Sequence, residues 1–73
     1  MATPHEAVQQ LIKTMNGSST ISNEIKAAAA EGLGYAGGTL AREALIKVIN
    51  GSSTVAAEVK AAAAKALGHA ASR

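Results

Sequence analysis

The chain is short, rich in alanine and almost free of aromatic residues. It has 73 residues, a formal net charge of +2, no cysteine, and Tyr35 as its one aromatic residue. This length allows a single small domain, and the missing cysteines exclude disulfides, zinc–thiolate sites and cysteine nucleophiles. Basic residues are spread along the chain without aromatic partners, which argues against nucleic-acid binding. No long apolar run or signal peptide pattern is present, so we expect a cytoplasmic protein that does not bind membranes.

The apolar residues supply little core material. Leucine, isoleucine, valine and phenylalanine together number 14, against 18 alanines. That share lies just under the ~20% at which disorder becomes a concern, but disorder also calls for high net charge. The composition therefore predicts a folded domain with a lean core.

The chain contains an internal repeat: one sequence unit occurs twice, with a period of 34 residues. The pentapeptide Asn-Gly-Ser-Ser-Thr occurs at 16–20 and 50–54, and pairing 7–38 with 41–72 gives 18 identities in 32 positions. A fixed period of this length indicates stacked supersecondary units. We expect repeat 1 at about 4–37 and repeat 2 at about 38–71.

Each unit has the pattern of two helices joined by a turn. Helices are predicted at about 4–15, 21–36, 40–49 and 55–70, and no strand is predicted. Thr3, Pro4 and Glu6 form the start signal of the first helix, including a capping box. Four apolar stripes at helical spacing are expected to face the core: Ala7, Val8, Leu11, Ile12 and Met15; Ile25, Ala29, Gly32, Leu33 and Ala36; Leu40, Ala41, Ala44, Leu45, Val48 and Ile49; Val55, Val59, Ala63, Ala66, Leu67 and Ala70.

The repeated pentapeptide is interpreted as the turn inside each unit. Its glycines, Gly17 and Gly51, should occupy equivalent positions, with a positive φ available to them, and Gly37-Gly38 should end the second helix. The hydroxyl residues at 18–22 offer caps to the next helix. A phosphate-binding loop would follow a strand and end in Gly-Lys-Ser/Thr, so a simple turn is the better reading.

The alanine blocks at 27–30 and 61–64 favour helix and let neighbouring backbones approach closely. We therefore expect the second helix of each unit to pack on more than one side. A membrane-surface helix is the competing interpretation, but alanine supplies little of the apolar area that it needs.

The segment 58–68, Glu-Val-Lys-Ala-Ala-Ala-Ala-Lys-Ala-Leu-Gly, resembles the second helix of a HEAT repeat. It is most similar to the short HEAT-like repeats of phycobilin lyase subunits and bacterial scaffold proteins. The segment 24–37 fits the same pattern, and 42–49 fits the first helix that follows, so the resemblance covers nearly the whole chain. It implies an all-α fold of two stacked helix-turn-helix units, a short α-solenoid. Tetratricopeptide repeats share the 34-residue period but require aromatic residues and a proline that are missing here.

Few residues suit catalysis or metal binding. The two histidines, His5 and His69, stand at non-equivalent positions of the repeat, and the serines and threonines near the turns have no histidine close in sequence. An active site needs a nucleophile with a base, paired carboxylates or metal ligands. We expect no enzyme activity, no cofactor and no metal, with exposed or interface histidines.

The remaining possibility is an interaction surface. Corresponding residues of stacked helical units form rows, so Tyr35 should lie beside His69, and Glu31 beside Lys65. Tyrosine is enriched at binding hot spots, so Tyr35 is the first candidate for a contact; the alternative is that it packs across the unit boundary. A scaffold or adaptor that binds another protein is the leading prediction. The alternative is an accessory subunit of an enzyme such as a phycobilin lyase, for which two units look short.

Two units also look too few for a stable array. Self-association is therefore expected, and a closed two-fold dimer is the expected symmetry because head-to-tail stacking runs on into a filament.

Overall fold

The computed structural model describes residues 3–17, 20–51 and 55–72, and all regular structure in them is helical. The helices are α1 (Pro4–Met15), α2 (Asn23–Ala36), α3 (Gly38–Ile49) and α4 (Ala57–Ala71). The prediction of an all-helical chain is confirmed, and every helix end lies within two residues of the expected position. The molecule is flat, with principal extents of 31 × 26 × 15 Å.

The start of α1 carries the expected capping box. The Thr3 hydroxyl accepts a hydrogen bond from the Glu6 backbone N–H at 3.1 Å, and the Glu6 carboxylate accepts one from the Thr3 N–H at 2.9 Å. Hydrogen bonding of the Glu6 carboxylate, first to the Thr3 backbone N–H and then to the Thr3 side chain, lowers the pKa of Glu6. Two backbone donors that a helix start leaves without partners are thereby satisfied.

The turn glycines are equivalent, but they are not in the left-handed region. The Gly17 and Gly51 N–H groups donate to the carbonyl oxygens of Thr14 and Val48, both at 3.1 Å. Among the described residues, only Gly37 and Gly38 have positive φ, so the expectation of a positive φ at Gly17 and Gly51 is wrong. Space is the constraint instead. A Cβ at Gly17 would overlap Cδ1 of Ile21, and one at Gly51 would lie 3.0 Å from the carbonyl oxygen of Val48. Residues 18–19 and 52–54 of the two pentapeptides lie outside the described residues.

The junction of the two units is where glycine is needed for its backbone conformation. Gly37 ends α2 with φ of 67° and donates its N–H to the Leu33 carbonyl, and α3 starts at once at Gly38, with φ of 85°. A side chain is strained at such angles, whereas glycine is not. The two glycines therefore reverse the chain between α2 and α3 without a loop.

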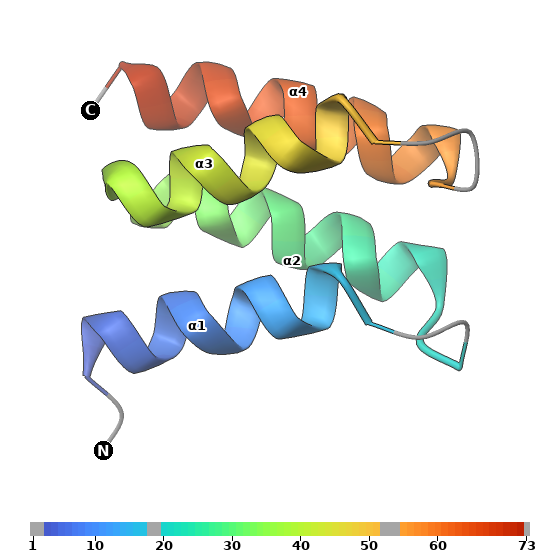
Figure 1. Ribbon diagram of the computed structural model, residues 1–73, viewed down its shortest axis with the longest axis horizontal. Helices are drawn as coiled ribbons and strands as arrows, with labels where there is room; N and C mark the ends of the chain where they lie inside the picture. Colours follow the sequence, from blue (N-terminus) through green and yellow to red (C-terminus); the bar gives the residue numbers. More distant parts are fainter. Residues whose placement is uncertain (1–2, 18–19, 52–54, 73) are drawn as a thin grey trace.

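The helices form two hairpins, α1 with α2 and α3 with α4, and the hairpins meet mainly through α2 and α4 (Figure 1). The helices α2 and α4 run in the same direction, and α1 and α4 lie at opposite edges of the molecule. As expected, α2 packs on more than one side, against α1, α3 and α4.

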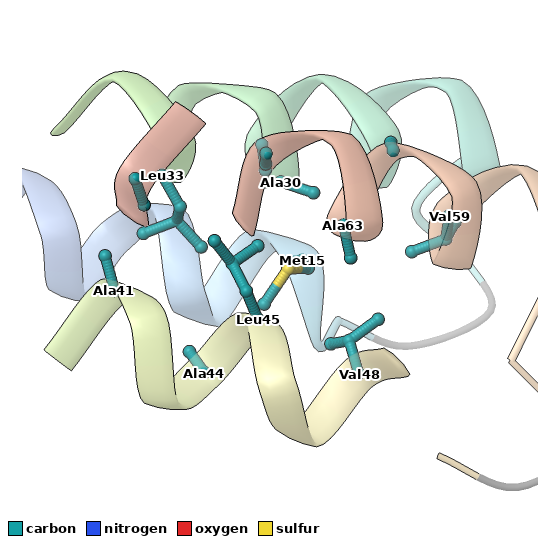
Figure 2. Packing of buried hydrophobic residues seen from close by; sticks show 13 residues of the cluster. Met15, Ala30, Leu33, Ala41, Ala44, Leu45, Val48, Val59 and Ala63 are labelled. Atoms are coloured by element: carbon teal, nitrogen blue, oxygen red, sulfur yellow. The ribbon is translucent and has the colours of Figure 1, made fainter. Parts of the chain in front are cut away.

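The core is made chiefly of alanine. Figure 2 shows Leu33 and Leu45, the largest side chains with no exposure, pointing toward each other near Met15. Around them lie the small buried residues: Ala29, Ala30, Ala41, Ala44, Val48, Val59, Ala62, Ala63, Ala66 and Ala70. Short side chains fill this core only if the helix backbones come close together.

The closest approach is at Gly34 of α2. A Cβ placed there would lie 2.7 Å from the carbonyl oxygen, 2.8 Å from Cα and 2.9 Å from Cβ of Ala66 in α4. Real Cβ atoms do not come this close, so only glycine fits. The corresponding Gly68 of α4 has no described atom within 4 Å of its Cβ position.

The apolar stripes are confirmed in part. Four of their members are exposed rather than buried: Ala7, Ile25, Ala36 and Leu40. Each has the helical spacing of a core residue, but no other helix covers its side. None of the helices in the described parts of the chain is long and apolar enough to span a membrane.

The starts of α2 and α4 provide a matched test of capping. Ser22 accepts a hydrogen bond from the Ile25 N–H at 3.2 Å, whereas Ala56, at the same position of unit 2, has no side-chain cap. The backbone angles of the two residues are alike, with φ/ψ of −65°/153° and −60°/141°. We expect Ser22→Ala to lower the free energy of unfolding, and Ala56→Ser to raise it, by about 1 kcal/mol each. Urea unfolding followed by circular dichroism measures both, and a loss of stability in Ala56→Ser would contradict the cap geometry.

The glycine pair Gly34 and Gly68 provides a second matched test. Gly34→Ala should destabilise the fold by about 1–3 kcal/mol, because the backbones of α2 and α4 must move apart. Gly68→Ala should stabilise it by up to ~1 kcal/mol, because alanine favours helix and the added methyl meets nothing. Chemical denaturation at low protein concentration gives both values. Equal effects of the same sign would show that α2 and α4 do not depend on contact at Gly34.

Candidate interaction surface

Tyr35 and His69 form a stacked pair across the boundary between the two units. Tyr35 lies in the last turn of α2 and His69 at the equivalent position of α4. Their ring centroids are 5.8 Å apart and the ring planes are inclined by 26°. The predicted row of Tyr35 and His69 is therefore present. It arises because α2 and α4 run side by side in the same direction and carry the two rings at equivalent positions.

The pair is exposed as well as stacked. Tyr35 exposes 64% of its surface, more than any other large apolar or aromatic side chain described. The sequence left open whether Tyr35 would be exposed or would pack across the unit boundary, and it does both. An exposed aromatic ring held in place by a neighbour loses little conformational entropy when a partner binds it.

Glu31 and Lys65 lie one helical turn before the rings. They line a shallow hollow of about 30 Å³ together with Tyr35, Ala66 and His69. All four predicted surface residues thus come together, and we call them the α2–α4 row: Glu31, Tyr35, Lys65 and His69. The hollow has room for about a water molecule and no more. The row presents an acid, a base and two rings on one small area, which suits contact with a protein surface better than enclosure of a small molecule.

Two further depressions lie elsewhere. One, of about 260 Å³, opens beside the turns of both hairpins and is lined by Met15, Asn16, Gly17, Asn23, Lys26, Val48, Val55, Ala56 and Val59. The other is an open groove of about 380 Å³ between α1 and α3, lined by Gln9, Ile12, Lys13 and Leu40. Sequence reasoning did not find either one. Each joins residues from separate helices, and no motif links those residues along the chain.

The residues suited to chemistry are scattered. His5 is exposed in the first turn of α1, and His69 stacks on Tyr35. Within the described residues, no group of three or more histidine, cysteine, aspartate or glutamate side chains could hold a metal ion. The α2–α4 row, by contrast, gathers an acid, a base and two rings on one small area.

Comparison of the chain with protein-family models, with curated proteins and with solved structures finds no match in any of the three.

The stacked pair can be tested with a double-mutant cycle on Tyr35→Ala and His69→Ala. Stacked aromatic pairs contribute about 0.5–1.5 kcal/mol beyond their buried area, and we expect the low end because this pair is exposed. The coupling energy follows from urea unfolding of the wild type, both single variants and the double variant. Strictly additive effects would show that the two rings do not interact in solution.

Proposed function

We propose that the chain is a non-enzymatic protein–protein interaction module, a small scaffold or adaptor. Its four helices form two HEAT-like helix pairs, and the α2–α4 row contacts the partner. The observation that carries this proposal is the exposed Tyr35 ring, held by His69 beside the opposite charges of Glu31 and Lys65.

The HEAT-like arrangement is supported by the way the units meet. In such arrays equivalent helices of successive units lie side by side, and α2 and α4 pack in this manner over their length. In each hairpin the first helix, α1 or α3, packs against the second helix, α2 or α4. The same parallel packing brings equivalent residues of the two units together in rows.

The chemistry of the row fits a protein partner. Tyrosine buries a large area on binding at a small entropic cost, and its hydroxyl also offers a hydrogen bond. Glu31 and Lys65 add charges of both signs, which orient a partner more than they increase its affinity. The backbone beneath the row is fixed by the Gly34–Ala66 contact, so the surface is preorganised.

Photocrosslinking from position 35, followed by affinity measurement, tests the proposal. A photoreactive phenylalanine analogue at position 35 should crosslink one protein in a host extract. With that protein purified, Tyr35→Ala should weaken binding on the order of 30-fold, as for a hot spot of ~2 kcal/mol. Ile46→Ala is the matched control, because Ile46 is a large side chain on α3 that is 45% exposed and lies outside the row.

Each outcome of this experiment has a clear meaning. An unchanged affinity in Tyr35→Ala, with Ile46→Ala weakened, would move the binding surface away from the row. A chain that crosslinks nothing would count against a binding module. A coloured preparation from the native host would instead favour the alternative, an accessory subunit of an enzyme such as a phycobilin lyase.

A further inference from the structure

The two copies of the alanine-rich helix are buried on different sides. Ala30 and Gly34 of α2 are buried, whereas their counterparts in α4, Ala64 and Gly68, are exposed. The sequence around them is nearly the same, so composition does not explain the difference. The explanation is that α4 covers this side of α2, and no described residue covers the same side of α4.

The opposite side shows the converse. Val59 is only 2% exposed in α4, whereas its counterpart Ile25 in α2 is 54% exposed. In the same way, Ala62 is buried and its counterpart Ala28 is exposed. Ala66, on this side of α4, lies against Gly34 of α2, whereas on the same side of α2 Ile25 and Ala28 are exposed and Gly32 lies against the side chain of Leu11 of α1. The molecule therefore has an uncovered face on α4 and a partly covered face on α2. The first is equivalent to the α2 side of the α2–α4 contact, and the second is equivalent to its α4 side.

We name these faces by their places in the array. The end face lies on α4, at one edge of the molecule in Figure 1. It consists of the small exposed residues Ala61, Ala64, Gly68 and Ala71. The start face lies on α2 and consists of Ile25, Ala28 and Gly32, of which Gly32 is half-buried.

We propose that the end face of one chain binds the start face of a second copy, head to tail. This inference goes beyond the proposed partner binding and does not depend on it. The α2–α4 contact within the chain shows how the junction is built, because the same residue types meet there already. In the junction Gly68 takes the place of Gly34, and Gly32 of the second copy takes the place of Ala66. Gly68 has nothing near its Cβ position and leaves room for a close approach of the backbones, whereas the Leu11 side chain already lies 3.3 Å from the Cβ position of Gly32.

Charge supports a head-to-tail junction over a two-fold dimer. Within the chain, Glu31 of α2 and Lys65 of α4 line the same hollow. In a head-to-tail junction Lys65 meets Glu31 of the second copy, so the opposite charges again face each other. An antiparallel two-fold dimer through the end faces brings Lys65 of both copies to the same edge of the contact, because Lys65 follows Ala64 at the edge of that face, about halfway along it. Like charges in contact oppose association, and opposite charges set its register.

The first hairpin adds a limit to the strength of this junction. Gln10 and Thr14 of α1 stand where α3 has the buried Ala44 and Val48, and the Thr14 hydroxyl donates to the Gln10 carbonyl at 3.0 Å. The surface of α1 next to the start face is thus more polar than the corresponding surface of α3. We therefore expect association that depends on concentration and is weaker than the packing of the two hairpins within one chain.

Two single substitutions block one face each. Ala28→Arg blocks the start face, and Ala64→Arg blocks the end face; both positions are exposed, and arginine is a good helix former. Helical circular dichroism and urea unfolding first verify that both variants fold. Sedimentation equilibrium then measures the mass of the wild type, of each variant alone, and of an equimolar mixture of the two variants.

Head-to-tail association predicts three results. The wild-type average mass rises with concentration beyond twice the 7.2 kDa of one chain. Each variant alone stays a monomer. The mixture forms a 1:1 complex and no larger species, because one open start face binds one open end face.

Three results would overturn the proposal. The wild type could remain a monomer at hundreds of micromolar. Ala28→Arg could still form a dimer while Ala64→Arg does not, which is the behaviour of a two-fold dimer through the end faces. Two folded, monomeric variants could fail to combine when mixed, which would mean that the two faces do not bind each other.

Discussion

The fold depends on how closely the backbones of α2 and α4 approach at Gly34 and Ala66. Most buried side chains are alanines, and an alanine core has little apolar area to remove from water. Such a core is dense only when the helix axes are close, so that backbone atoms of one helix contact backbone atoms of the next. Gly34 makes this possible, because any larger residue at that position would collide with the Ala66 backbone.

The same approach positions the candidate surface. Parallel helices that touch along their length bring equivalent side chains together, so the rings of Tyr35 and His69 stack although they are far apart in sequence. Glu31 and Lys65 line the same hollow one helical turn before the rings. The surface is thus a direct product of the duplication. The second unit differs from the first at both row positions, which places a ring beside an imidazole and an acid beside a base.

Duplication also explains why identical sequence has different roles in the two units. Each alanine-rich helix, α2 or α4, has two sides on which another unit could pack. In this chain α2 meets the other unit on one of these sides and α4 meets it on the other. Gly34 and Gly68 both follow a leucine at equivalent positions of the repeat, yet one is required by contact and the other is open. Ser22 caps its helix, whereas Ala56 at the equivalent position does not. The two units have the same local structure but different packing.

The sequence by itself determined the local structure and the repeat. Helix starts, the capping box at Thr3, and the pairing of Tyr35 with His69 and of Glu31 with Lys65 all followed from spacing, capping residues and the period. These features depend on residues within one turn, or on a translation by one unit. The tertiary structure alone decided which sides are covered and which glycine needs a positive φ. Ile25 and Val59 have the same periodic position but opposite burial, because periodicity marks an apolar side and not the presence of a neighbour. For the same reason the two larger depressions, built by residues from separate helices, left no pattern along the chain.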